Sequence, residues 1–284
     1  MKILYYDCFA GISGDMNLGA MIDLGVKEEY LKEELAKLNL DGEFQIEVKR
    51  DSRKGISGTK VDVVLLNQHE HHHHNEENHC CGHHGDHQCC NEHKHVHINE
   101  EHGHSHSHSH SHEHRNLIHI EKIINESSLN NNVKELSKKM FLKVAEAEAK
   151  VHGKDLYEVH FHEVGATDSI VDIIGAAICL DYLKVDEVMA STVQVGGGFV
   201  KCAHGLMPVP APATAEILKG IPITSGIIKY EATTPTGAAI LATTVKEFTD
   251  SKDFTIEKTG YGVGTIDKEI PNILRVFLAK KKLV

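Results

Sequence analysis

A histidine-rich tract at residues 68–115 divides the chain and limits what the rest can fold into. It holds 19 of the 24 histidines, and His119 just beyond it makes 20 between His69 and His119. It has almost no apolar side chains, so it cannot pack a core, and we expect it to be disordered without metal. The core must therefore come from the two flanks, residues 1–67 and 116–284, with the tract as a long insertion.

Short apolar runs alternate with amphipathic stretches in the flanks, which predicts an α/β fold with mixed layers (α+β). KILYYDCF is expected to be a buried strand, GDMNLGAMIDLG and residues 27–38 helices, and FQIEVKRD with TKVDVVLLN a hairpin. A long helix is predicted over NNNVKELSKKMFLKVAEAEAKVHG, with an asparagine cap and a closing Gly153. A second, apolar nearly all round, is predicted over ATDSIVDIIGAAICLDYL.

Further elements are predicted near the C-terminus. VMASTVQVG is expected to form one strand, and PAPATAEILKG a helix that ends at Gly220. PTGAAILATTVKEF is expected to form a helix opened by Pro235, after which the chain returns to strands.

The charge balance argues against nucleic acid as a partner. The tract carries eight acidic residues against Lys94 and Arg115, a net of −6, which leaves −5 of the formal charge of −11 elsewhere. The flanks thus have no basic stripe for a phosphate backbone. No segment approaches ~18 consecutive apolar residues, and the N-terminus does not resemble a signal peptide, so we expect no membrane partner and a cytoplasmic location.

The cysteines indicate metal ligation rather than cross-linking. There are seven, an odd number, and four form two adjacent pairs inside the tract. In a reducing compartment Cys beside His is typical of soft-metal binding, and neutral imidazole binds Ni, Zn, Cu and Co. We predict multi-site, weakly selective metal binding; a solvated acidic insertion is the alternative. The predicted tract ligands are His71, His72, His73, His74, Cys80, Cys81, His83, His84, Cys89, Cys90, His104, His106, His108, His110 and His112.

The most concentrated chemistry outside the tract lies in HGKDLYEVHFHEVGATDSIVDI. Within its first 21 residues stand His152, His160, His162, Glu163, Asp168 and Asp172. In an extended segment His160 and His162 share one face, and the two aspartates share one face of the following helix. A metal or a polar substrate would satisfy such a group. The structural alternative is that Asp168 stabilises the N-terminus of the helix, while His160 or His162 forms a hydrogen bond in the core.

Three glycine- or threonine-rich segments are candidate binding loops. DCFAGISGDM places Asp7 at a strand end, Gly11 and Gly14 in a turn, and Asp15 at a helix start, where open α/β sheets bind ligands. VGGGFVKCAHG offers backbone approach to an anion at Gly196, Gly197 and Gly198, and soft ligation by Cys202 and His204. In EATTPTGAAIL, Thr234 and Thr236 lie at the start of a predicted helix. Helix capping is the first interpretation of these hydroxyls, and anion binding is the second. The alternative is that each segment is only structural, as a turn, a hairpin or a helix cap. GYGVG at 260–264 is by itself weak evidence for a binding loop.

These motifs carry a family resemblance. FAGISGDM, HFHEVGATDSIVDI, VGGG with HGLMPVPAPATAEIL, EATTPTGAAIL, GYGVG and PNILRV occur in the order found in LarC-type nickel-insertion proteins, and they span the ordered chain. The resemblance implies insertion of Ni²⁺ into pyridinium-3,5-bisthiocarboxylic acid mononucleotide, giving the nickel-pincer nucleotide cofactor of lactate racemase. It also implies CTP with Mn²⁺ or Mg²⁺, and a tract that feeds nickel to the reaction. Apo lactate racemase would be the recipient, and we expect a homo-oligomer.

The resemblance suggests roles for the candidate residues. Nickel would pass from the tract to an ordered site near His160, His162, Glu163 and His204. Asp15, Asp168 and Asp172 are candidate bases for removing a ring proton. Relatives bind CTP through a further C-terminal region, whereas this sequence stops soon after PNILRV, so we expect that region to be absent or supplied as a partner chain. The main alternative is a nickel or zinc storage or delivery protein, and a metallohydrolase is a weaker one.

Overall fold

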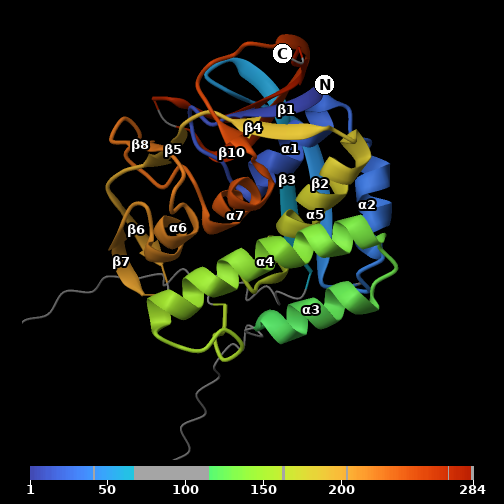
Figure 1. Ribbon diagram of the computed structural model, residues 1–284, viewed down its shortest axis with the longest axis vertical. Helices are drawn as coiled ribbons and strands as arrows, with labels where there is room; N and C mark the ends of the chain where they lie inside the picture. The colour runs from blue at the N-terminus through green and yellow to red at the C-terminus, as the bar shows by residue number, and fades with distance from the viewer. Residues whose placement is uncertain (41, 67–114, 162–163, 203, 268, 283–284) are drawn as a thin grey trace, which may run out of the picture. The chain divides into compact units, whose positions relative to one another are not determined.

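A seven-stranded mixed sheet supports the fold (Figure 1). Its strands, in the order in which they lie side by side, are β2 (Phe44–Arg53), β3 (Ile56–Leu65), β10 (Thr255–Asp267), β11 (Pro271–Lys280), β1 (Lys2–Asp7), β4 (Glu187–Ala190) and β9 (Glu247–Phe248). The structure, a computed structural model, describes residues 1–40, 42–66, 115–161, 164–202, 204–267 and 269–282. Those on both sides of the tract belong to one structural unit. The predicted mixed α/β class is thus confirmed, while the predicted disorder of the tract lies outside the described residues.

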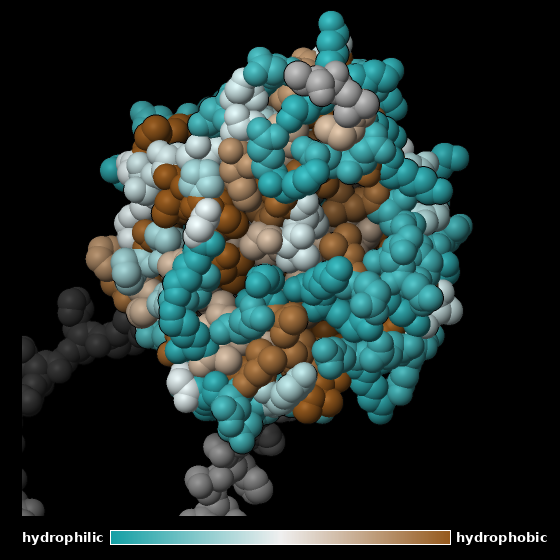
Figure 2. Space-filling model, in the orientation of Figure 1, coloured by the Kyte–Doolittle hydropathy of each residue, from teal (hydrophilic) through white to brown (hydrophobic). Residues whose placement is uncertain are grey.

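Helices cover the sheet and pack on one another. They are α1 (Gly14–Leu24), α2 (Glu28–Ala36), α3 (Leu117–Glu126), α4 (Asn131–His152), α5 (Thr167–Leu183), α6 (Pro212–Ile217) and α7 (Pro235–Thr244). α1 lies against the sheet, α5 packs on α1, and α4 packs across α5 and α7 (Figure 1). Figure 2 shows hydrophilic side chains along much of α4, whose other side faces those helices. None of the described helices is long and apolar enough to cross a membrane.

β1 is buried because it has neighbours on every side. It runs antiparallel to β11 and parallel to β4, and its Leu4 and Tyr6 join the main core with the helices. Tyr5 belongs to a second apolar cluster with Met189 and Phe277. A strand that is covered on both faces reads as a continuous apolar run, which explains why KILYYD shows no alternation.

Glycines let α1 lie directly on the sheet. A Cβ atom at Gly262 of β10 would lie 1.7 Å from the carbonyl oxygen of Met16, and one at Gly260 would lie 2.3 Å from that of Ala20. On the helix side, a Cβ at Gly19 would lie 2.3 Å from the carbonyl oxygen of Thr59 in β3. The GYGVG motif therefore has a packing role: it sets the position of α1 and hence of the loop that precedes this helix.

Several local predictions are confirmed. The β2–β3 hairpin forms, and α4 begins where the Asn130 side chain accepts the backbone N–H of Val133 at 3.0 Å. α4 ends at Gly153, whose φ of 60° is the left-handed conformation that glycine tolerates.

Other local predictions are wrong in their bounds. VMASTVQVG forms two strands, β4 and β5 (Val193–Gly196), because Ser191 and Thr192 turn away to pair with the Cys8 N–H and with Asp250. α6 ends at Ile217 rather than Gly220, since a turn from Leu218 to Ile221 replaces the last helical residues. α7 ends at Thr244, and KEF instead joins β4 through β9.

Two small sheets complete the described fold. β5 pairs in parallel with β8 (Ile223–Ser225), and β6 (Phe199–Cys202) forms an antiparallel hairpin with β7 (Gly205–Pro208). The segment VGGGFVKCAHG runs from the end of β5 through β6 to the start of β7, so it lies outside the main sheet, which the chain has left after β4.

Candidate functional site

The loop after β1 is held against the start of α7. The backbone N–H of Thr234 donates to the carbonyl oxygen of Ile12 at 3.1 Å, and Ile12 forms a β-bridge with Thr233. Gly237 permits this contact, because a Cβ there would lie 2.2 Å from the same oxygen of Ile12. These contacts place the first residues of α7 beside the turn that begins α1.

The start of α5 meets the same turn from another side. A Cβ at Gly14 would lie 2.1 Å from Oδ2 of Asp172, so the second turn of α5 contacts the first residue of α1. The starts of α1, α5 and α7 therefore come together, and each helix start offers backbone N–H groups and a partial positive charge. We call Gly14, Asp15, Asp172, Thr234 and Thr236 the helix-start site.

Two carboxyl groups of this site have raised pKa values. Burial raises the pKa of Asp172 well above its usual range, and the nearby charges of Asp15 and Asp168 raise it further. Burial also raises the pKa of Asp15, although the Ser13 hydroxyl, which donates to it, and Lys60 oppose the rise. Oδ1 of Asp172 is buried without a hydrogen-bond partner among the residues that the structure describes. Such a carboxyl group holds a proton to a higher pH than an exposed aspartate does, which suits it to proton transfer.

The other predicted residues near the helix starts have different environments. Asp168 lies in the first turn of α5 and is exposed. The Thr234 hydroxyl accepts the Gly237 N–H at 3.3 Å and lies 2.9 Å from the Thr236 hydroxyl, so the predicted cap is confirmed. Asp7 is buried and accepts the Arg275 Nε–H at 2.9 Å, which compensates its charge within the fold.

Backbone packing accounts for the remaining predicted glycines. A Cβ at Gly11 would lie 2.0 Å from the carbonyl oxygen of Ala232, and one at Gly196 would lie 1.9 Å from that of Tyr230. Gly197 and Gly198 run beside the same segment, with Cβ positions 3.1 and 3.3 Å from the nearest carbonyl oxygens. Their contribution to ligand binding stays a prediction, and the packing alone explains why glycine stands at each position.

A second group of side chains lies where the β6–β7 hairpin meets the end of α4. Cys202 Sγ is 3.9 Å from His204 Nδ1, and the rings of His204 and His152 have centroids 4.8 Å apart. His152 Nε2 lies 3.3 Å from Oε2 of Glu148, one turn earlier on α4. Burial first, then His204 and Lys154, lower the pKa of His152. The pairing of Cys202 with His204 was predicted, whereas the approach of His152 and Glu148 was not.

The ordered nickel site predicted at HFHE remains largely untested. His160 is exposed and forms a β-bridge with Asn116, directly after the tract. His162, Glu163 and all of the predicted tract ligands lie outside the described residues. Within the described ranges, no three His, Cys, Asp or Glu side chains are arranged to hold a metal ion.

Leu66 and Arg115, the described residues on either side of residues 67–114, both contact Glu43. The Leu66 N–H donates to the carbonyl oxygen of Glu43 at 3.0 Å, and the Arg115 guanidinium donates to its carboxylate at 2.8 Å. Arg115 and the same carboxylate also contact the Thr167 hydroxyl, at 2.9 and 2.8 Å, so the anchor touches the start of α5. Residues that flank the tract thus lie beside both His160 and α5.

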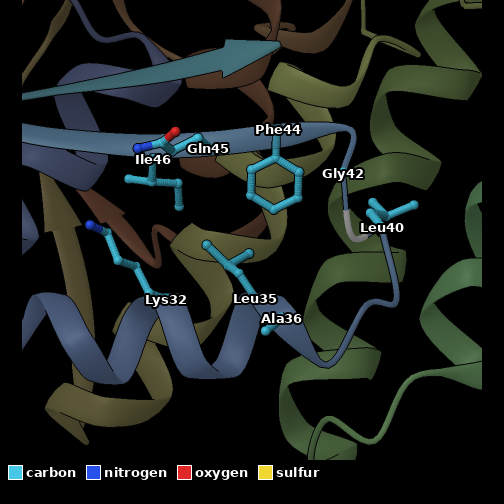
Figure 3. A pocket seen from close by; sticks show the side chains of 8 residues that line it. All are labelled: Lys32, Leu35, Ala36, Leu40, Gly42, Phe44, Gln45 and Ile46. Carbon is cyan, nitrogen blue, oxygen red and sulfur yellow. The ribbon is translucent and has the colours of Figure 1, made fainter. Parts of the chain in front are cut away.

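Two open pockets lie away from these residues. One, of about 180 Å³, separates α2 from β2 and is lined largely by apolar side chains around Leu35 and Phe44 (Figure 3). The other, of about 430 Å³, lies between α4 and α6 beside Lys143 and Lys219. Neither is lined by a predicted site residue, and the first is smaller than the ~300 Å³ at which ligand pockets usually begin.

Helix starts, hydroxyls and carboxyl groups thus gather beside the carboxyl end of β1, where open α/β sheets bind ligands, so the fold and site define an α/β protein with a candidate ligand site at this edge of its sheet. Comparison with known proteins narrows this class. The chain matches the family model Ni_insertion, described as nickel insertion protein, over residues 4–284. It therefore belongs to the nickel insertion protein family. No solved structure matches it.

Named relatives resemble the chain over nearly its whole length. A protein of Clostridium acetobutylicum named pyridinium-3,5-bisthiocarboxylic acid mononucleotide nickel insertion protein is 63% identical over 99% of the chain. Proteins with the same name from Clostridium kluyveri and Akkermansia muciniphila are 59% and 45% identical, each over 99% of the chain. The chain spans 65%, 63% and 61% of these three relatives, which is less than two thirds of each.

Proposed function

We propose that the chain inserts Ni²⁺ into pyridinium-3,5-bisthiocarboxylic acid mononucleotide and so forms a nickel-pincer nucleotide, as a chelatase-type lyase. The observation that carries the proposal is the family match over residues 4–284, together with relatives that bear the name of this activity. Those names favour insertion over the alternative of metal storage. The product would serve apo lactate racemase or another enzyme that uses the cofactor, and CTP with Mn²⁺ or Mg²⁺ would support the reaction.

The helix-start site would bind the phosphate of the mononucleotide. Contacts at Ile12 and Gly14 bring the start of α1 close to those of α7 and α5, and the Thr234 and Thr236 hydroxyls lie at the start of α7. A phosphate is favoured at such a position by hydrogen bonds and by the helix dipoles together.

Carboxyl groups of the same site would take up the ring proton. When the carbon–nickel bond forms, the ring C–H bond breaks, its electron pair goes to the new bond, and the proton passes to a base. Asp172 and Asp15 suit this role, because burial raises the pKa of both, and Asp168 at the exposed first turn can pass the proton to solvent.

We expect Thr234→Ala to weaken substrate binding more than turnover. The loss of one hydroxyl near a phosphate should raise KM for the mononucleotide about tenfold and leave kcat nearly unchanged. It should also lower the free energy of unfolding by about 1 kcal/mol, because α7 loses its cap. Asn130→Ala, which removes the cap of α4, is the matched control: it should cost similar stability without a change in KM. Equal KM values for both variants would contradict the phosphate role.

The tract would concentrate nickel for the ordered part of the chain. Arg115, the last residue of the tract, contacts Glu43, and Thr167 at the start of α5, so we expect nickel bound by the tract to be released close to the proposed reaction site. Tethering raises the local concentration of a weakly held ion without any tight site.

A full-length variant tests this feeder role. It has Ser or Gln in place of every His and Cys between residues 68 and 114, so that chain length is kept. At saturating nickel we expect insertion at the wild-type rate, whereas at limiting nickel we expect about a fivefold loss. A storage protein would lose its function at all nickel concentrations, and equal rates at limiting nickel would exclude a feeder.

A further inference from the structure

Three soft or borderline metal donors meet at the junction of the β6–β7 hairpin with the end of α4. They are Cys202, His204 and His152, which come from segments 50 residues apart in the sequence, and they lie outside both the tract and the helix-start site. Thiolate with imidazole is the donor set that suits Ni²⁺, Zn²⁺ and Cu ions.

The sulfur-to-nitrogen distance is close to that of a bound metal. Cys202 Sγ and His204 Nδ1 are 3.9 Å apart. With metal–sulfur and metal–nitrogen bonds of about 2.3 and 2.0 Å, a tetrahedral angle puts the two donors about 3.5 Å apart. A shift of a few tenths of an ångström, within the freedom of two side chains at a hairpin end, would bring both onto one ion.

The two imidazole rings are also spaced as on one ion. Their centroids are 4.8 Å apart. Two imidazoles with metal–nitrogen bonds of about 2.0 Å have centroids about 4.4 to 5.1 Å apart for bond angles of about 90 to 110°. The present tilt of 42° between the rings leaves their orientation to be adjusted on binding, which agrees with the absence of a preformed three-ligand group among the described side chains.

Glu148 provides the second, independent observation. Its side chain is buried, with only 7% of its surface exposed, and its carboxylate lies 3.3 Å from His152 Nε2. Metal-bound histidines usually direct the second ring nitrogen toward a carboxylate, which fixes the tautomer and the ring orientation. A proton on Nε2, facing Glu148, leaves Nδ1 of His152 as the metal donor.

We propose that Cys202, His204 and His152 bind one nickel ion, with Glu148 as the residue that positions His152. Three protein ligands leave a coordination position open, as in sites that exchange ligands rather than in closed structural sites. The thiocarboxylate sulfurs of the substrate can then replace them stepwise. This inference rests on the proposed function for the identity of the metal, and it adds a holding site between the tract and the reaction.

Nickel binding by the 284-residue chain without His or Cys in its tract, the variant described above, tests the site without any substrate. Of the remaining cysteines, Cys8 and Cys179 are fully buried, and burial raises the pKa of Cys179 to about 12, so Cys202 is the available thiolate. Titration with NiCl₂ should show one equivalent bound with a thiolate-to-nickel charge-transfer band. The band should vanish in Cys202→Ser, and His152→Ala or His204→Ala should weaken binding at least about tenfold.

Two further variants complete the test. Glu148→Gln should keep the charge-transfer band and weaken nickel binding about tenfold, because it removes only the group that orients the ligand. His119→Ala, an exposed histidine on α3, is the matched control and should bind as the parent does. A band that persists in Cys202→Ser, or wild-type affinity in both histidine variants, would overturn the proposal. Normal nickel binding combined with no insertion would count against the proposed function alone.

Discussion

Asp172→Asn is expected to slow nickel insertion by about 100-fold or more while making the fold more stable at neutral pH. The carboxyl group is buried against Gly14 and near Asp15, and its Oδ1 has no hydrogen-bond partner in the described part of the chain. An amide keeps the shape but cannot accept the ring proton. It also avoids the unfavourable burial of a negative charge, so activity and stability should change in opposite directions.

The pH dependence of stability follows from the raised pKa of Asp172. Below the pKa of the unfolded carboxyl, both states are protonated and the contribution of this group to stability is complete. As the pH rises toward the higher folded pKa, the unfolded chain ionises first, so the contribution is lost. Asp172→Asn should therefore flatten the fall in the free energy of unfolding between acid and neutral pH. Urea denaturation at a series of pH values measures the slope.

A matched control lies on the same helix. Asp181 lies in the last turn of α5, away from the helix-start site, and accepts a hydrogen bond from Asn130, so Asp181→Asn should change neither insertion nor the pH slope in this way. Insertion at the wild-type rate in Asp172→Asn would exclude this residue as the base, and a loss of stability at neutral pH would contradict the raised pKa of its buried carboxyl group.

Gly262→Ala is expected to have the largest effect on folding. The new Cβ would lie 1.7 Å from the Met16 carbonyl oxygen and 2.7 Å from the Ala20 backbone nitrogen, and neither backbone atom can move without shifting α1. The free energy of unfolding should fall by about 3 kcal/mol or more. Because α1 carries Asp15 into the helix-start site, the folded fraction that remains should also insert nickel more slowly. Thermal and urea unfolding measure the first effect.

Gly55→Ala separates close packing from the general effect of replacing glycine. Gly55 has a φ of 81° and no atom within 4 Å of its Cβ position, so alanine there meets only the backbone penalty of about 1 kcal/mol. Similar losses at both positions would show that the contact between α1 and β10 is looser than described.

Local signals in the sequence predicted much of the fold. An asparagine cap and a final glycine define α4, and the continuous apolar run of β1 indicates a strand covered on both faces. Where tertiary contacts decide, the sequence was insufficient. The break of VMASTVQVG at Ser191 depends on partners from residue 8 and residue 250, and no local pattern reports them.

The same division holds for the candidate sites. The spacing of glycine, aspartate and threonine predicted that the starts of α1 and α7 carry functional residues, and the structure brings both starts together at Ile12. By contrast, the approach of His152 to His204 depends on how α4 packs beside a hairpin 50 residues later in the sequence. Glu148 at i−4 from His152 was the one local signal that could have marked this group.

Direct detection of the inserted metal tests the central claim. The 284-residue chain is incubated with NiCl₂, pyridinium-3,5-bisthiocarboxylic acid mononucleotide, CTP and MnCl₂, with and without the part of the Clostridium acetobutylicum relative that it does not span. Mass spectrometry then follows the nickel-bearing mononucleotide, and apo lactate racemase reports its activity. We expect this product in the reaction that contains both the chain and the added part. We expect none with the added part alone. No nickel-bearing mononucleotide in either reaction would contradict the central claim.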